Sequence, residues 1–122
     1  MKSSTDDILR FIASSFRSVW ALELLLALRR SPNKAGTCDE MVKELRSSTV
    51  AVREAIAGLQ KAGLVVEEGG LCSYRPASPA VDQIAGNIEK LYAIKPAAVV
   101  KAIVTAPNER LHLFADSFRL KD

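Results

Sequence analysis

The chain has 122 residues, 48% of them hydrophobic, and a formal net charge of +3 at pH 7. This length can bury one hydrophobic core but leaves little room for a second, so the sequence predicts one small domain with helical extensions. No uninterrupted apolar run is long enough to span a bilayer, because Glu23 interrupts the N-terminal candidate and Lys95 and Lys101 interrupt the later one.

The first residues and the cysteines indicate the compartment. Residues 1–7 are polar and acidic, whereas a secretory signal has a basic start and an apolar core. We therefore expect a cytoplasmic location. Cys38 and Cys72 lack metal-ligand spacing, and we interpret both as reduced structural thiols. A redox switch that uses them is the alternative.

Two helices are predicted ahead of residue 31. Polar residues at 5–7 can cap the first, and Ser15 can cap the second, which runs from Phe16 to about Arg30. The second helix is apolar in nearly every direction around its axis, so we expect a cover on both sides. One cover is the segment that follows; the other is the C-terminal part of this chain or of a second subunit. The apolar residues, interpreted as core or dimer seam and not as a ligand pocket, are Trp20, Leu22, Leu24, Leu25, Leu26 and Leu28.

The next stretch predicts two short helices joined by a tight turn. Thr37 is followed three residues later by Glu40, the spacing of a capping box, so a helix begins there. The polar cluster at 46–49 ends this helix and caps a second one near Ser48. The second helix ends at Gly63, where a left-handed cap is commonest. The inward positions are Met41, Val42 and Leu45 in the first helix and Val52, Ile56 and Leu59 in the second.

Two β-favouring runs follow, at residues 64–67 and 71–75. They are joined through Glu68-Gly69-Gly70, where paired glycines provide the positive φ angles of a tight hairpin. Pro76 closes the second strand. Two helices, a tight turn and a hairpin in this order predict a helix-turn-helix with a wing, in a mainly α fold of the α+β class.

Residues 52–65 carry a resemblance to a known family. Their apolar and glycine positions, Val52, Ile56, Leu59 and Gly63-Leu64-Val65, resemble the second helix and wing of winged-helix transcriptional regulators of the broad MarR and ArsR-like kind. The resemblance covers roughly the first two thirds of the chain. It implies a winged helix-turn-helix domain at residues 1–78 and a role as a DNA-binding regulator. The paired-cysteine metal-sensing pattern of some ArsR-like proteins is absent from this sequence.

Three helical segments are predicted after the hairpin. Ser78-Pro79 places an N-cap before a proline at the first helical position, and this helix runs to about Ile94. Pro96 opens a shorter helix. Asn108 can cap a last amphipathic turn or two, in which the apolar residues are Leu111, Phe114 and Phe118.

Residues 79–122 are expected to be a dimerisation extension. In many winged-helix regulators the elements after the wing build the dimer, so the resemblance implies a homodimer through residues 79–122 and the Trp20–Leu28 helix, or packing of the two on each other. Docking on a membrane surface or a partner is the alternative, because the apolar stripes carry basic neighbours.

The predicted second helix, about residues 48–62, has an outward side that suits the major groove of DNA, with the hairpin 64–75 as the wing. There Arg53 can pair with guanine, Val50 with a thymine methyl group, and the hydroxyl groups with phosphate. Arg46 is expected near the DNA backbone. The predicted DNA-binding residues are Arg46, Ser48, Thr49, Val50, Arg53 and Arg75.

The charge balance argues against strong DNA binding. Residues 31–78 contain as many acidic as basic residues, so the positive net charge comes from outside the motif. Glu54 lies in the middle of the outward helix face, and Glu67 and Glu68 are expected at the wing tip, where each would approach phosphates. The alternative function is therefore a winged-helix protein interaction module with weak or no DNA binding.

The sequence offers no catalytic constellation. Its one histidine, His112, lies between Leu111 and Leu113, with no cysteine or serine around it. No glycine-rich phosphate loop, metal-ligand cluster or carboxylate pair at catalytic spacing is present. We therefore expect neither an enzyme nor a bound cofactor or metal.

Overall fold

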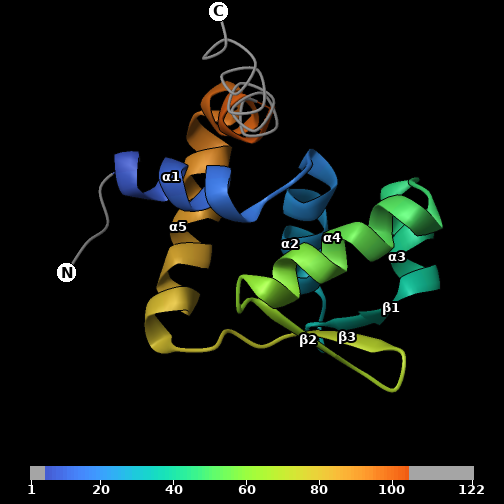
Figure 1. The fold of residues 1–122 in the computed structure, drawn as a ribbon. Coiled ribbons are helices and arrows are strands. Elements are labelled where there is room, and N and C mark those ends of the chain that lie inside the picture. The colour runs from blue at the N-terminus through green and yellow to red at the C-terminus, as the bar shows by residue number, and fades with distance from the viewer. Residues whose placement is uncertain (1–4, 105–122) are drawn as a thin grey trace, which may run out of the picture.

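The computed structural model describes residues 5–104 (Figure 1). Most of this part is helical, with one three-stranded antiparallel sheet, which confirms the α+β class. The expected turn at Asn108 and the histidine at 112 lie outside the described residues. The elements are α1 (Thr5–Ser15), α2 (Val19–Arg30), β1 (Ala35–Thr37), α3 (Cys38–Leu45), α4 (Thr49–Lys61), β2 (Val65–Glu68), β3 (Leu71–Tyr74) and α5 (Pro79–Ile94), and residues 96–104 are also helical.

Local capping signals begin α3 and α4 where the sequence predicts. The Thr37 hydroxyl oxygen accepts the Glu40 N–H at 3.1 Å, and the Glu40 carboxylate accepts the Thr37 N–H at 2.8 Å, so the capping box is complete. The Ser48 hydroxyl oxygen accepts the Ala51 N–H at 3.1 Å. Both predictions are confirmed because each depends only on residues three positions apart.

The glycines of the predicted turns have positive φ angles. Gly63, after the end of α4, has φ of 80°, and Gly69 and Gly70 of the hairpin have φ of 58° and 82°. Glu68 belongs to β2 and pairs with Leu71, so the hairpin turn itself consists of the two glycines. Residues with side chains rarely adopt these angles, which explains why glycine occupies all three positions.

The second helix begins later than predicted. Ser15 is the last residue of α1, and the N-cap of α2 is Ser18, with extended backbone angles. Phe16 is fully buried, and its N–H donates to the carbonyl oxygen of Ile12 at 2.9 Å. The predicted cap at Ser15 is therefore wrong, because the chain continues the last turn of α1 to bring Phe16 into the core.

Strand β1 is not predicted from the sequence. This strand pairs antiparallel with β3, in the register Ala35↔Ser73 and Thr37↔Leu71, and gives the strand order β1-β3-β2. A Cβ atom added at Gly36 would lie 2.7 Å from the Met41 methyl group, so α3 packs closely over the strand. Three residues around a glycine are too short to show the alternation from which a strand is recognised.

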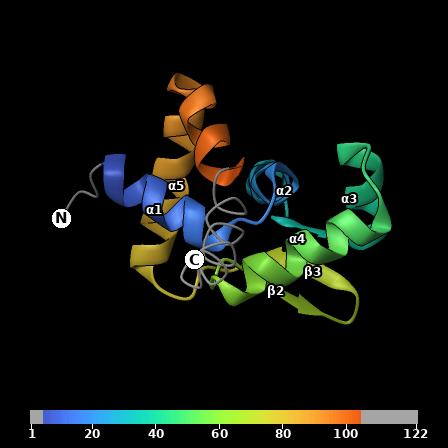
Figure 2. The same cartoon turned by 45° about the horizontal axis from the view of Figure 1, so that its top comes forward.

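Helix α2 lies in the centre of the fold. Figure 2 shows it nearly end-on, with α1 and α5 on one side and α3 and α4 on the other. Both covers therefore come from the same chain, and Tyr92 of α5 donates to the Glu23 carboxylate of α2 at 3.2 Å. Of the residues assigned to a dimer seam in this helix, only Trp20 remains exposed, at 38%. The leucines at 22, 24, 25, 26 and 28 are each at most 1% exposed.

Within residues 5–104, no single helix is both long and apolar enough to cross a membrane. Only α1 and α2 taken together would pass on length and composition, and the two are bent by 109° relative to each other.

A polar network joins the end of α2 to β3 and α5. Arg29 donates from Nη1 to the Tyr74 hydroxyl at 2.9 Å and from Nε to the Glu89 carboxylate at 3.1 Å. The Tyr74 hydroxyl in turn donates to Asp82 at 2.6 Å, and the Arg29 guanidinium lies 5.1 Å from the Tyr74 ring centroid. These contacts fix the base of the hairpin relative to both helices.

We expect the Tyr74→Phe variant to lose part of the pH dependence of stability at high pH. Burial and the hydrogen bond to Asp82 raise the pKa of Tyr74 from 10.0 to about 12. Because the neutral phenol is the form that the fold favours, its contribution is complete below about pH 10 and is lost as the pH rises through about 12. Urea denaturation across this window should therefore show a free energy of unfolding that falls more steeply in the wild type than in the variant.

Tyr92→Phe is the comparison variant. It retains the Tyr74 network, and because burial raises the pKa of Tyr92 by less than that of Tyr74, it should lose a smaller part of the pH dependence. A difference in the free energy of unfolding between wild type and Tyr74→Phe that stays constant from about pH 9 to about pH 12 would contradict this account.

Candidate nucleic-acid interface

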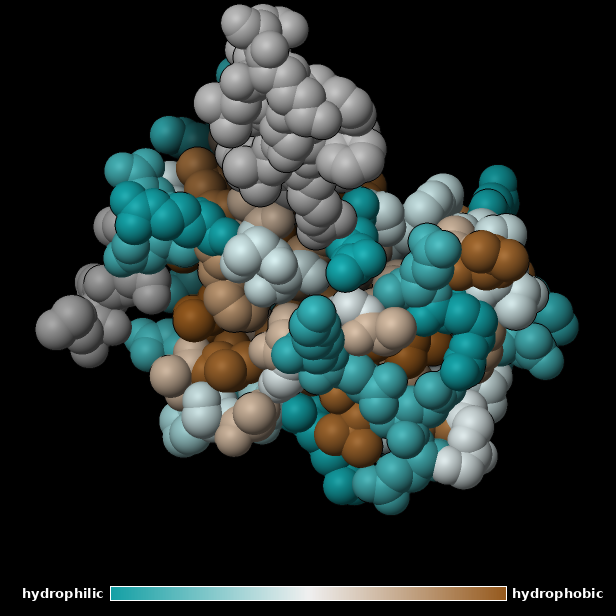
Figure 3. Space-filling view, in the orientation of Figure 1, coloured by the Kyte–Doolittle hydropathy of each residue, from teal (hydrophilic) through white to brown (hydrophobic). Residues whose placement is uncertain are grey.

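Helix α4 has one buried and one exposed side, as its periodicity predicts. Val52, Ile56 and Leu59 are at most 1% exposed, whereas Val50 is 68% exposed. In Figure 3, which views the molecule with α4 in front, hydrophilic residues cover most of this helix. The other positions that the periodicity places outward, Arg53, Glu54, Ala57 and Lys61, are all exposed.

The start of α4 brings together most of the predicted DNA-binding residues, all of them exposed. Arg46 is the C-cap of α3 in the left-handed conformation, with φ of 52°, so the chain turns sharply into α4. The Ser48 oxygen accepts a backbone N–H as the cap of α4, which leaves its hydroxyl hydrogen available to a ligand. The residues gathered here are Arg46, Ser48, Thr49, Val50 and Arg53.

Arg75 does not join this group. Its backbone N–H donates to the Leu64 carbonyl oxygen at 3.1 Å, so Arg75 lies at the base of the hairpin, beyond the C-terminal end of α4. The 13 residues of α4 separate the two ends of the helix by about 20 Å. Arg75 lines a shallow groove of about 180 Å³ on the hairpin, together with Val66, Glu68, Leu71 and Ser73.

The Arg53 side chain forms an ion pair with the hairpin. Its Nη1 lies 2.6 Å from Glu67 Oε2, and the Glu67 side chain is only 16% exposed. The hydrogen bond and the charge of Glu67 raise the pKa of Arg53 above its usual value. The expected place of Glu67 at the wing tip is therefore wrong, since its side chain lies against α4 and only Glu68 remains exposed.

Both cysteines lie close to this ion pair and are free thiols. Cys38, the first residue of α3, adds a weaker interaction with Arg53. Cys72 is fully buried opposite Glu67 on the neighbouring strand, and burial, followed by the charge of Glu67, raises its pKa to about 11. Cys72 is therefore a protonated core thiol at neutral pH. In the described part of the chain, no group of three or more His, Cys, Asp or Glu side chains could hold a metal ion.

The structure adds Arg17, which the sequence analysis did not single out, to the exposed side of α4. Two shallow depressions of about 230 and 310 Å³ flank Gly58, and both are lined by Arg17 and Lys61. Arg17 belongs to the connection between α1 and α2, so only the packing of α1 against α4 brings it here. No local pattern in the sequence predicts that Arg17 lies near Lys61.

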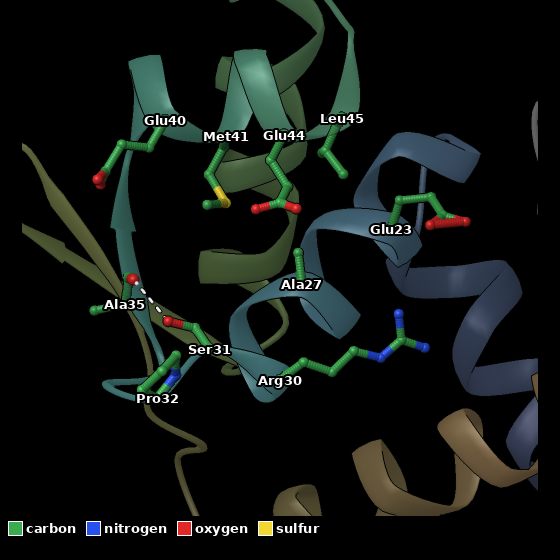
Figure 4. A pocket seen from close by; sticks show the side chains of 10 residues that line it. All are labelled: Glu23, Ala27, Arg30, Ser31, Pro32, Ala35, Glu40, Met41, Glu44 and Leu45. Atoms are coloured by element: carbon green, nitrogen blue, oxygen red, sulfur yellow. Dashed lines mark hydrogen bonds between the residues drawn. The ribbon is translucent and has the colours of Figure 1, made fainter.

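A separate groove of about 510 Å³ lies between α2 and α3 (Figure 4). Figure 4 shows Met41 and the Glu44 carboxylate directed into it and the Glu40 carboxylate turned away. Arg30, its one basic residue, lies 3.8 Å from the Glu89 carboxylate. The Glu44 carboxylate inside the groove repels phosphate, and Arg30 is already close to a carboxylate, so this groove does not favour an anionic ligand. The lining residues are Glu23, Ala27, Arg30, Ser31, Pro32, Ala35, Glu40, Met41, Glu44 and Leu45.

No family model, curated protein or solved structure matches this chain.

We expect the Glu67→Gln variant to loosen the hairpin from α4. The substitution keeps the size of the side chain but removes the charge that holds Arg53 at 2.6 Å. Hydrogen exchange at the amides of β2 and β3 should become faster, because the hairpin then opens without breaking an ion pair. Glu68→Gln is the control, since Glu68 is exposed on the same strand. Equal exchange in the two variants would show that the ion pair does not hold the hairpin.

Proposed function

We propose that this chain is a winged helix-turn-helix regulator of transcription that binds double-stranded DNA, with α4 in the major groove and the β2–β3 hairpin as the wing. One observation carries the proposal. Helix α4 packs on the core by a single stripe and leaves the other side of the helix exposed along its whole length. An exposed helix that follows another helix across a tight turn is the arrangement with which helix-turn-helix proteins read the major groove.

The residues at the start of α4 have distinct roles in this proposal. The free hydroxyl hydrogens of Ser48 and Thr49 donate to phosphates, and Arg46 neutralises a phosphate at the turn. Val50 contacts the methyl group of a thymine. Arg53 uses Nη1 for Glu67, and the remaining N–H groups of its guanidinium are left to pair with guanine.

The alternative, a protein interaction module, is supported by two features of the same surface. Glu67 neutralises the charge of Arg53, and Glu54 is exposed on the outward side of α4. Val50, at 68% exposure, would then contact an apolar surface of a partner.

We also propose that two chains associate through the end of α5 and the helical residues 96–104. Ile94 is 74% exposed and Val104 is 52% exposed, and exposed aliphatic side chains of this size favour burial by a partner. A dimer presents two copies of α4, as a reader of two half-sites about 34 Å apart needs.

Binding of random-sequence duplex DNA tests the regulator directly. For the wild type, the logarithm of the association constant should fall linearly with the logarithm of the salt concentration, and Arg46→Ala should reduce the slope by about 0.9. Arg53→Ala should weaken binding further, because it removes the base contact and leaves Glu67 uncompensated. Lys90→Ala on α5 is the control. Absence of binding at low salt, or binding indifferent to Arg46→Ala and Arg53→Ala, would reject the regulator in favour of the interaction module.

Light scattering tests the dimer. The wild type should have the mass of two chains at micromolar concentration, and Ile94→Asp should have the mass of one, because a charge replaces the apolar contact. Leu71→Asp, at a 43% exposed position on the hairpin, is the matched control and should remain a dimer. A monomeric wild type would eliminate this proposal.

A further inference from the structure

Two basic side chains from distant parts of the chain meet at the C-terminal half of α4. Arg17 and Lys61 both line the depressions on either side of Gly58. A Cβ atom added at Gly58 would have only the Ser15 carbonyl oxygen near it, at 3.7 Å, so the surface between the two cations is open. Gly58 thus leaves a notch that is lined by one positive charge from the α1–α2 connection and one from α4.

Neither charge is neutralised within residues 5–104. Arg17 and Lys61 are exposed, and their side chains form no hydrogen bond or ion pair with the described residues, whereas the side chains of Arg29 and Arg53 pair with carboxylates. Lys61 at the end of α4 is favourable for the helix dipole, but that effect does not account for Arg17. Two like charges that line one notch repel each other, and a bound anion would remove this repulsion.

The length of α4 indicates which anion. The major groove is about 12 Å wide, and a helix of 13 residues is about 20 Å long. If the start of α4 enters the groove, the other end must pass over a sugar-phosphate backbone. Val50 and Lys61 lie on the same outward side of the helix, about 17 Å apart along its axis.

We infer that Arg17 and Lys61 form a site for a backbone phosphodiester of double-stranded DNA, with Gly58 providing the room for the phosphate. The inference rests on the proposed entry of α4 into the major groove. It adds a phosphate contact from the α1–α2 connection. It also places the main positive charge of the interface at the C-terminal half of α4, since Glu67 neutralises Arg53. Glu54, which lines one of the two depressions, opposes this contact.

Salt-dependent titration with random-sequence duplex DNA tests the site. Arg17→Gln and Lys61→Gln should each reduce the slope of log K against log salt by about 0.9, and the double variant by about 1.8. Both should weaken binding equally for duplexes of different sequence, because a phosphate carries no base information. Glu54→Gln should strengthen binding. Lys90→Gln, an exposed position on α5, is the matched control and should keep the wild-type slope.

The outcomes separate this inference from the proposed function. If the wild type binds duplex DNA and Arg46→Ala weakens it, but Arg17→Gln and Lys61→Gln keep the wild-type slope, the phosphate site is rejected and the regulator stands. If the wild type does not bind at low salt, both are rejected. A second arm titrates the wild type with inorganic phosphate. Saturation at concentrations similar to those of duplex phosphate would identify a site for small anions and reject the DNA backbone as its ligand.

Discussion

Helix α2 is apolar over most of its circumference, and the other helices lie where they cover it; only the side that carries Glu23 and Arg30 lines an open groove. Its five leucines are each at most 1% exposed, and burial of one leucine side chain stabilises a fold by about 1.5–3 kcal/mol. Helix α4 covers one side with its single apolar stripe, while α1 and α5 lie on the other side (Figure 2), where α5 bonds to Glu23 and Arg29 of α2. The exposed side of α4 is therefore a consequence of how the core is closed, because only the apolar stripe of this helix is needed to cover α2.

The Arg29 network connects the β2–β3 hairpin, which we propose as the wing, with α5, which we propose leads to the dimer interface. Tyr74 at the base of the hairpin contacts Arg29 of α2, and Asp82 and Glu89 of α5 complete the network. Among the described residues, no buried side-chain nitrogen or oxygen lacks a hydrogen-bond partner, so the polar contacts do not weaken the core. The hairpin and the helix proposed to lead to the dimer interface therefore share one anchor. A displacement of α5 would change the contact between Asp82 and Tyr74 at the base of the hairpin.

The distribution of charge over α4 differs from the distribution along the sequence. Residues 31–78 carry equal numbers of acidic and basic residues, so their net charge is zero. The net charge does not show which of these charges are paired in the folded chain. In the folded chain Glu67 neutralises Arg53, whereas Arg17, from outside the counted segment, lies beside Lys61. The unpaired positive charge of Arg17 and Lys61 therefore lies near the end of α4, whereas the charge of Arg53 near its start is paired. Whether a protein surface attracts phosphate depends on which of its charges remain unpaired and lie on the same face.

The sequence by itself determined the features that depend on neighbouring residues. The capping box of Thr37, the cap at Ser48 and the glycines at the turns follow from contacts a few positions apart, and the inward stripe of α4 follows from its periodicity. Most of the helices and the hairpin were therefore predictable, with five of the six candidate DNA-binding residues in one place. Only the tertiary structure decided β1, the late start of α2, the Arg53–Glu67 pair and the position of Arg17. Each of these depends on segments that are distant in the chain and meet only when the core around α2 closes.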